Sequence, residues 1–339
     1  MSNDLIIEIK DLRKYYPIYK GFIKSIFSKE KTYVHAVDGI NFNIKAGETL
    51  GLVGESGCGK TTAGLLLLKL IEPTSGSIFF QGVDIATLSE HEIKEIRKKM
   101  QIIFQNPYES LSPRFNVLDA IAEPLRLLKV LKDEKAILER VKDTLKAVGL
   151  PQTEDFFERF PHELSGGQRQ RIGVARAFVL NPLFIVADEP VSMLDVSIRV
   201  GVLRIMKELV QQFRTGFLFI THDLALARYM CDRVAVMYLG RIVEEGKTEE
   251  IIQNPLHPYT KALISAVPIP DPDARRTKDI PITGEVPSGI FLPLGCRFHP
   301  RCIYAKEECR ETDPELVRTN DNDHFVACIR YNEIMNDNN

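Results

Sequence analysis

The sequence of 339 residues contains no tryptophan and no hydrophobic run long enough to cross a membrane. Its longest aliphatic stretch, residues 65–71, is interrupted by Lys69, whereas a transmembrane helix needs about 20 predominantly apolar residues. Residues 1–8 are mixed polar and acidic, so they lack the basic stretch followed by an apolar block that marks a secretory signal. We therefore expect a protein that stays in the cytoplasm.

Neither sign of charge is in excess. Lysine and arginine together number 44 and aspartate and glutamate 46, so no overall basic field points to a nucleic-acid partner, and none is expected. Hydrophobic residues make up 44% of the chain and charged residues 27%, as in folded globular proteins. The length allows one large domain and a smaller appendage.

Short apolar segments alternate with helical ones, which predicts an α/β fold with parallel strands. Between about residues 107 and 180 the pattern is mostly helical and indicates an inserted helical subdomain. The main domain is expected to span residues 1–267. Seven prolines and three glycines between residues 268 and 300 predict an irregular linker, and the polar segment 331–339 predicts a disordered tail.

A glycine-rich loop, Gly54-Glu-Ser-Gly-Cys-Gly-Lys-Thr61, lies between an apolar strand and a helix start. This pattern binds nucleotide phosphates, because glycines let backbone N–H groups converge at a helix N-terminus while the lysine reaches the β- and γ-phosphates. The threonine hydroxyl can ligate Mg²⁺. A plain glycine turn joining strand to helix is the alternative. The nucleotide contacts expected here are Gly54, Glu55, Ser56, Gly57, Cys58, Gly59, Lys60, Thr61 and Thr62.

A second acidic motif, Leu183-Phe-Ile-Val-Ala-Asp-Glu189, is an apolar strand that ends in two carboxylates. Behind a phosphate loop, Asp188 is expected to hold Mg²⁺ through water and Glu189 to orient or deprotonate the attacking water. Taken alone, such a strand end is as often structural. Together the two motifs specify only a nucleoside triphosphatase.

The pentapeptide Leu164-Ser-Gly-Gly-Gln168, about two dozen residues before Asp188, resembles the signature loop of the ABC ATPase family. In that family the loop opens a helix and binds the γ-phosphate of an ATP held by the opposite subunit. A hydroxyl, bare amides and a helix N-terminus suit an anion, whereas a polar loop with a helix cap is the plain alternative. The signature residues are Leu164, Ser165, Gly166, Gly167 and Gln168.

Further positions match the same family in order and placement. The resemblance implies that Gln105 contacts Mg²⁺ or water and touches a permease, that Asp195 crosses the dimer interface and that His222 contacts the γ-phosphate. It also implies that an aromatic residue stacks on adenine, for which Tyr16 is chosen and Tyr15 is the alternative. The implied Mg²⁺ ligands are Thr61, Gln105 and Asp188. The implied fold is a parallel-sheet core with an antiparallel β part and an inserted helical subdomain.

The resemblance is strongest to the oligopeptide/dipeptide importer ATPases. It extends to about Cys328, through segments such as Gln105-Asn-Pro-Tyr-Glu-Ser-Leu-Ser-Pro-Arg114, and the insertion at residues 17–35 is similar to the F-type ATPase of those systems. It implies ATP-driven uptake together with a second ATPase subunit, two permease subunits and an extracytoplasmic solute-binding protein, at the cytoplasmic face of the membrane. Oligosaccharides or nickel are alternative cargoes. A soluble ABC ATPase of DNA repair or translation is the alternative from another class.

Within that insertion, residues 21–31 place apolar side chains at helical spacing among lysines. One hypothesis is that this segment rests against the permease or an anionic lipid surface. A surface loop with a few packed apolar residues is the equal alternative.

Four of the six cysteines lie near the C-terminus, at positions 296, 302, 309 and 328. In a reducing compartment, free thiols or metal ligands are expected rather than disulfides. The spacings of five, six and eighteen intervening residues do not match paired C-x-x-C zinc sites. The family resemblance implies a four-iron four-sulfur cluster ligated by Cys296, Cys302, Cys309 and Cys328, with zinc, aided by His299 or His324, and unmetallated thiols as alternatives.

Overall fold

The structure is a computed structural model that describes residues 4–18, 32–106, 111–266, 284–319 and 323–336. Segment 21–31, for which contact with the permease or an anionic lipid surface is one hypothesis, lies outside the described residues, as do residues 268–283 of the predicted linker. Within the described ranges, no helix combines the length and the apolar character needed to cross a bilayer.

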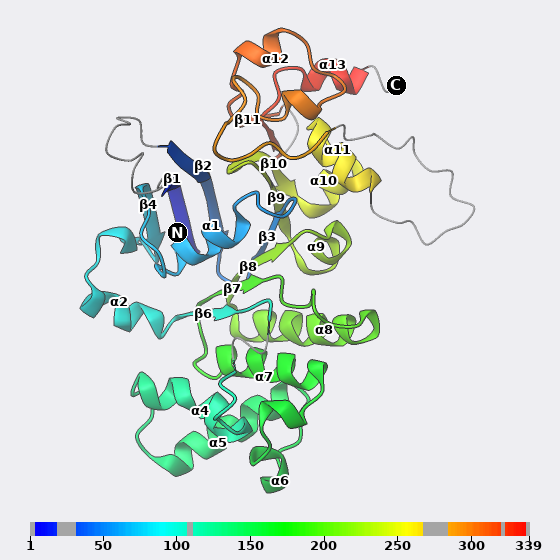
Figure 1. Ribbon diagram of the computed structural model, residues 1–339. Coiled ribbons are helices and arrows are strands. Elements are labelled where there is room, and N and C mark those ends of the chain that lie inside the picture. Colours follow the sequence, from blue (N-terminus) through cyan, green and yellow to red (C-terminus); the bar gives the residue numbers. More distant parts are fainter. Residues whose placement is uncertain (1–3, 19–31, 107–110, 267–283, 320–322, 337–339) are drawn as a thin grey trace, which may run out of the picture.

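The core is a mixed sheet whose central strands are parallel (Figure 1). Their side chains are almost entirely apolar and buried, as expected for parallel strands covered on both faces. The expected α/β core is therefore confirmed. In spatial order these strands are β9 (Arg233–Tyr238), β3 (Thr49–Val53), β8 (Gly216–Thr221), β7 (Phe184–Asp188) and β6 (Met100–Ile103).

A second sheet is antiparallel and packs beside the first. Its inner side chains, among them Ile7 and Ile44, join Leu50 and Leu52 of β3 in one buried cluster. The two sheets therefore share a core. The strands, in spatial order, are β2 (Thr32–Lys45), β1 (Leu5–Ile18), β4 (Ser75–Phe80) and β5 (Val83–Asp84).

Helices that follow the strands in the chain pack against the parallel sheet. The helix after the glycine-rich loop contacts β7 and β8, and the helix after β8 packs on β3 and β8. The helices of this part are α1 (Lys60–Leu67), α2 (Glu90–Arg97), α8 (Val196–Phe213), α9 (Leu224–Met230), α10 (Thr248–Gln253) and α11 (Pro258–Ser265), with the short 3₁₀ turn η1 (Ile85–Thr87).

A helical layer extends from the β6 end of the sheet (Figure 1). Its second helix begins where Asp133 accepts hydrogen bonds from backbone N–H groups, as its sequence predicts. The elements are α4 (Val117–Leu127), α5 (Glu134–Ala147), α6 (Glu154–Phe157), η2 (Pro161–Glu163) and α7 (Gly166–Phe178). Of these, α7 packs against β6 and α8 and so attaches the layer to the core.

The C-terminal region is joined to the core and is not the separate appendage that the sequence suggests. Strand β12 (Phe325–Val326) pairs with β10 (Arg241–Lys247), and β11 (Val317–Arg318) pairs with β12, so both extend the main sheet. The buried Glu244 carboxylate reinforces the junction by binding the ring of His324 at 2.8 Å and the N–H groups of Leu256 and His257. The remaining elements are η3 (His299–Arg301) and α12 (Glu308–Glu311).

The end of the chain also differs from expectation. Residues 331–336, predicted to be disordered, form helix α13 (Tyr331–Asn336). Ile334 is 1% exposed, and Glu333 accepts a 2.8 Å hydrogen bond from Arg330. Burial of Ile334 and the pairing of Glu333 with Arg330 and Lys306 attach this short polar helix to the domain.

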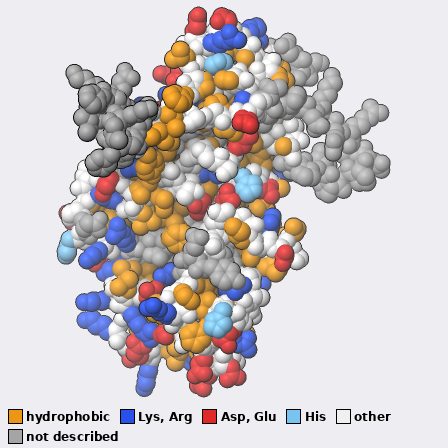
Figure 2. All heavy atoms as spheres, in the orientation of Figure 1, with side chains coloured by type: hydrophobic (Ala, Val, Ile, Leu, Met, Phe, Trp, Pro, Cys, Tyr) orange, Lys and Arg blue, Asp and Glu red, His pale blue; other side chains and the backbone are white. Residues whose placement is uncertain are grey.

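Acidic and basic side chains are interspersed over the face shown in Figure 2, with hydrophobic side chains between them. This distribution matches the near balance of charges in the sequence.

The buried His257 gives a pH prediction. Burial lowers its pKa to about 3 from an ordinary value near 6.5, and its Nδ1 accepts a hydrogen bond from Tyr259 N–H at the start of α11. The unfolded chain therefore binds a proton below pH 6.5 that the folded chain does not. The free energy of unfolding should fall by about 2 kcal/mol from this group between pH 7 and pH 5. Urea titrations should show this slope reduced in His257→Asn and unchanged in the exposed control His91→Asn.

Candidate active site

The glycine-rich loop is shaped by close contacts with both sheets. A Cβ on Gly54 would lie 2.2 Å from the Met237 carbonyl oxygen, and one on Gly59 would lie 2.0 Å from the Ala36 carbonyl oxygen. Gly59 also has a φ of +108°, a conformation that L side chains rarely adopt. Gly57 differs, because nothing lies within 4 Å of its would-be Cβ. The loop is thus fixed from behind and presents bare backbone on its open side.

The lysine and threonine that follow face the same cavity. The buried Lys60 Nζ donates to the carbonyl oxygens of Gly54 at 2.7 Å and Glu55 at 2.9 Å. Thr61 Oγ1 donates to Asp188 Oδ1 at 3.1 Å, which joins the loop to the end of β7. Burial is the main reason that the pKa of Asp188 is raised. The pair Thr61 and Asp188 thus supplies two oxygen ligands side by side, as Mg²⁺ prefers.

A cavity of about 650 Å³ extends from this loop. It includes most of the residues predicted from the loop and all three predicted catalytic side chains. Its lining consists of Val34, His35, Ala36, Glu55, Ser56, Gly57, Gly59, Lys60, Thr61, Thr62, Gln105, Glu189, His222, Leu239, Leu263 and Gly289.

Three polar side chains meet at the far end of that cavity. Gln105 Nε2 lies 3.3 Å from Glu189 Oε2, and His222 Nδ1 lies 3.1 Å from Glu189 Oε1. Glu189 has a φ of +45°, a strained conformation for a residue with a side chain. Its N–H donates to the Ile220 carbonyl oxygen and its own carbonyl accepts from Ser192, so the backbone around it holds this geometry.

The predicted signature loop lies elsewhere. At the start of α7, the Ser165 hydroxyl accepts a hydrogen bond from Gln168 N–H and the Gln168 side chain accepts one from Ser165 N–H. The two bonds form a capping box. A Cβ on Gly167 would meet Ile198 Cγ2 of α8 at 2.7 Å, whereas Gly166 has more room. Ser165 is exposed, and no member of 164–168 is among the described residues that line the cavity. The loop therefore presents a helix N-terminus to the surroundings and not to the chain's own phosphate loop.

The residue predicted to cross a dimer interface stands in an exposed apolar setting. Asp195 precedes α8 and makes no capping bond with its side chain. Near it, Met193 is 66% exposed, Val196 74% and Val200 57%. Apolar side chains this exposed and this close together are typical of a contact surface.

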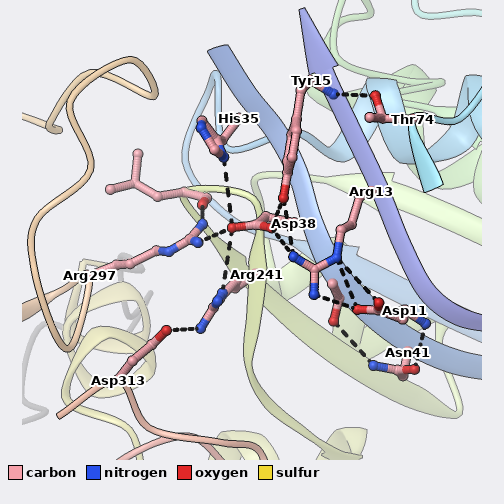
Figure 3. Close-up of polar contacts among 12 residues, drawn as sticks. Asp11, Arg13, Tyr15, His35, Asp38, Asn41, Thr74, Arg241, Arg297 and Asp313 are labelled. Atoms are coloured by element: carbon pink, nitrogen blue, oxygen red, sulfur yellow. Dashed lines mark hydrogen bonds and ion pairs between the residues drawn. The ribbon is translucent and has the colours of Figure 1, made fainter. Parts of the chain in front are cut away.

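The two candidate adenine-stacking tyrosines have different surroundings. The Tyr15 hydroxyl points to Asp38, to which it donates a hydrogen bond, and its ring lies 4.2 Å from the His35 ring (Figure 3). Tyr16 is 38% exposed and pairs across the strands with Val34, which lines the cavity. Neither tyrosine lines the cavity itself. Since Tyr15 is held by Asp38, Tyr16 stays the better candidate.

Comparison with known proteins agrees with this geometry. The profile of the ABC transporter family matches residues 37–192, and that of the oligopeptide/dipeptide transporter C-terminal region matches residues 243–309. The oligopeptide transport ATP-binding protein AppF of Bacillus subtilis is 46% identical over 97% of this chain and 98% of its own length. The chain belongs to the ABC transporter ATP-binding proteins. It is an ABC-type ATPase.

Solved structures of ABC ATP-binding proteins have the same fold as this chain. The dimeric, post-hydrolysis form of the cassette MJ0796 bound to ADP and Pi is 28% identical, with a TM-score of 0.62, over 71% of this chain and 98% of its own. The protein cbiO1 of Clostridium perfringens, described as part of the ABC transporter complex cbiONQ, is 28% identical with a TM-score of 0.62, over 74% of this chain and 92% of its own. The second family match begins at residue 243, ahead of the boundary expected near 267.

Several residues of this ABC ATPase site are not apparent from its motifs. Val34, His35 and Ala36 of β2 and the distant Leu263 and Gly289 complete the cavity wall. Nothing in their local sequence marks them, because they reach the site only through the sheet pairing and the docking of the C-terminal region. His35 N–H donates to the Gly289 carbonyl at 3.0 Å, which brings the C-terminal region to the cavity.

The four C-terminal cysteines lie together. All of them line one small cavity of about 20 Å³. Burial raises the pKa of Cys296 to about 11 and that of Cys328 to about 12. Among the described residues, however, no three His, Cys, Asp or Glu side chains are arranged to hold a metal ion. The predicted metal site is thus not supported by ligand geometry. The zinc alternative also has one candidate ligand fewer, because the ring of His324 is hydrogen-bonded to Glu244.

The catalytic arrangement leads to a prediction for Glu189→Gln. Removal of the carboxylate deprives the attacking water of its base, while the phosphate loop remains, so ATP binding should persist and turnover should fall about 100-fold or more. Steady-state phosphate release and equilibrium binding of ATP measure the two effects. The exposed carboxylate variant Glu95→Gln is the control and should match the unmodified protein. Normal turnover in Glu189→Gln would show that another group is the base.

Proposed function

We propose that this ABC ATPase energises the import of dipeptides or oligopeptides at the cytoplasmic face of the cell membrane, with two permease subunits and an extracytoplasmic solute-binding protein. The observation that carries the proposal is the joint presence, in one chain, of a cavity lined by the phosphate loop and the predicted catalytic side chains and of a C-terminal region of oligopeptide/dipeptide transporter type. The name of the Bacillus relative, matched over nearly its whole length, gives further support.

The residues of the cavity have separate tasks in hydrolysis. The amides of the phosphate loop and Lys60 bind the phosphates of ATP. Mg²⁺ neutralises phosphate charge when bound. The adjacent oxygens of Thr61 and Asp188, together with Gln105, are suitable ligands for it. Glu189 accepts a proton from the water that attacks the γ-phosphorus, and ADP and phosphate form. His222, 3.1 Å from Glu189, is proposed to contact the γ-phosphate.

The proposed working unit is a head-to-tail pair with a second, different ATPase subunit. The exposed Ser165, the absence of residues 164–168 from the lining of the chain's own cavity, and the exposed apolar residues near Asp195 support it. In such a pair the helix N-terminus at Ser165 faces the γ-phosphate on the partner's phosphate loop. The ring of Tyr16 is proposed to stack on adenine in the chain's own site.

A groove next to the helical layer is the proposed permease site. It has a volume of about 280 Å³ between β6, the end of α1, α4 and α7. Leu127, 74% exposed, and Leu70, 47% exposed, lie at its edge, and Gln105 follows β6. A groove with exposed leucines where the helical layer meets the parallel sheet suits a permease segment that transmits ATP-driven closure.

A pull-down of the tagged chain tests the assignment to import. Co-purification of permease subunits, followed by peptide uptake in reconstituted vesicles, is the expected result. Recovery of ribosomes or DNA in place of permeases would contradict it, and uptake of an oligosaccharide or nickel would correct the cargo.

The shared site predicts an effect in trans for Ser165→Arg. A bulky cation at this helix N-terminus removes the hydroxyl and blocks the anion cradle, so the variant should bind ATP normally at its own phosphate loop. Hydrolysis at the partner's phosphate loop should fall at least about tenfold. The two sites are distinguished by assays in which first one subunit and then the other carries a phosphate-loop defect of the Lys60→Ala type. Loss of ATP binding at the variant's own loop would exclude the head-to-tail arrangement.

We also propose that the four cysteines hold a four-iron four-sulfur cluster with a structural role. Four thiols line one cavity, and four sulfur donors are the ligand set of such a cluster. The donor set therefore fits, although the described side chains form no metal-ion ligand group. A cluster would supply folding free energy to the proline-rich region.

Anaerobic purification from an iron-replete host tests the cluster. The expected protein is brown and contains about four irons per chain. Cys302→Ser should lose the colour and the iron. Colourless protein with one zinc, or with no metal, would contradict the cluster and would leave the ATPase assignment intact.

A further inference from the structure

An arginine from the cysteine-bearing region reaches the phosphate loop. Arg301 directly precedes Cys302, and its guanidinium donates from Nη1 to Glu55 Oε2 at 2.7 Å and from Nη2 to Glu55 Oε1 at 3.0 Å. The two residues are 246 positions apart in the sequence. The Arg301 side chain is only 6% exposed. A bidentate, largely buried pair of this kind is strong and directional.

Glu55 is held by its backbone as well. Its N–H donates to the hydroxyl of the buried Tyr259 at 2.8 Å, and its carbonyl accepts from Lys60 Nζ at 2.9 Å. Tyr259 packs on Phe298 and Tyr238, and Arg301 lies over the Tyr238 ring. One residue of the phosphate loop is therefore bound on three sides, and two of the three partners lie beyond the nucleotide-binding motifs.

A second arginine attaches the same segment at another point. Arg297, which directly follows Cys296, donates to the buried Asp38 carboxylate and to the Leu239 carbonyl (Figure 3). Asp38 also receives the Tyr15 hydroxyl and Arg13. The segment from 296 to 302 is thus fastened both to β2 and to the phosphate loop.

Charge explains why the contact to Glu55 matters for the nucleotide. Glu55 lines the cavity, and a carboxylate beside the phosphates of ATP repels them unless its charge is compensated. Lys60, the main cation of the loop, is bonded to backbone carbonyls there and not to that carboxylate. The guanidinium of Arg301 supplies the compensation.

We propose that Arg301 is a positioning residue for ATP, which acts through Glu55 by neutralising its carboxylate and holding the phosphate loop in shape. The inference rests on the cavity at the phosphate loop being the ATP site. By thermodynamic reciprocity, ATP bound at the loop also stabilises the attachment of the cysteine-bearing segment.

The primary experiment measures the equilibrium dissociation constant of the full-length chain for ATP in the Glu189→Gln background, so that hydrolysis does not interfere. Arg301→Met should weaken ATP binding about tenfold, as expected for the loss of charge-assisted hydrogen bonds. Arg301→Lys, which keeps the charge but not the fork, should show a smaller loss of about threefold. The matched control is Arg310→Met. Arg310 also adjoins a cysteine, yet it is exposed and bonded to Glu307, so this variant should bind ATP normally.

A double variant separates positioning from a purely structural role. If Arg301 acts by compensating Glu55, then Glu55→Gln added to Arg301→Met should recover most of the lost ATP affinity. A lowered melting temperature with unchanged ATP affinity in Arg301→Met would overturn the proposal, as would full additivity of the two changes. If Arg301→Met fails to fold, Arg301→Lys carries the test, and an affinity equal to that of the control would overturn it.

Failure of the site assignment is recognised separately. Lys60→Ala should abolish ATP binding if the phosphate loop is the ATP site. Normal ATP binding in Lys60→Ala would refute the site itself. Lost binding in Lys60→Ala together with normal binding in Arg301→Met would refute only the positioning role.

Discussion

The phosphate loop is held between two backbone carbonyls, and the rest of the site depends on this constraint. Gly54 lies against the Met237 carbonyl of β9 and Gly59 against the Ala36 carbonyl of β2, so the loop touches both sheets at once. The same junction includes the bond from Gly240 N–H to the Cys58 carbonyl at 2.9 Å. Because side chains are excluded at these contacts, the sheets themselves fix the loop, and its amides need no rearrangement to meet an anion.

The remaining machinery is built from strand ends that this junction aligns. Parallel strands β7 and β8 lie next to each other, so Asp188 and Glu189 at the end of one come close to His222 just after the other. The strained backbone of Glu189 is held by two hydrogen bonds, one from its N–H to the Ile220 carbonyl and one from Ser192 N–H to its own carbonyl. In the proposed head-to-tail pair this is half of a hydrolytic site, because Ser165 at the start of the signature helix is exposed and residues 164–168 do not line the chain's own cavity. The signature helix is held in this position by packing, because Gly167 lies so close to Ile198 of α8 that there is no room for a side chain.

What the sequence predicts well is local and continuous in the chain. The loop at 54–61, the acidic strand end at 188–189 and the capped helix after Ser165 each carry their signal within a few residues, because hydrogen bonding and backbone conformation act at short range. Spacing does not decide between Tyr15 and Tyr16 as the adenine-stacking residue, because their surroundings depend on pairing with distant strand residues such as Val34, and Tyr16 stays a prediction. The pairing of β12 with β10 and the helix at 331–336 were missed for a related reason. Short segments of two to six residues gain their order from distant partners such as Glu244 and from one buried Ile334.

The largest omission from sequence reasoning concerns the arginines beside the cysteines. Read as a pattern, Arg297, Arg301 and Arg310 look alike, as cations near thiols. In the structure the first two point inward to Asp38 and Glu55, while Arg310 faces solvent. A buried guanidinium is costly unless it is paired, so each inward arginine fixes its acidic partner as firmly as it is fixed itself. The C-terminal region and the nucleotide loop are therefore energetically coupled, whatever the cysteines bind. A change in the order of one must alter the free energy of the other, so the C-terminal region contributes to the shape of the phosphate loop and thereby to the proposed ATP site.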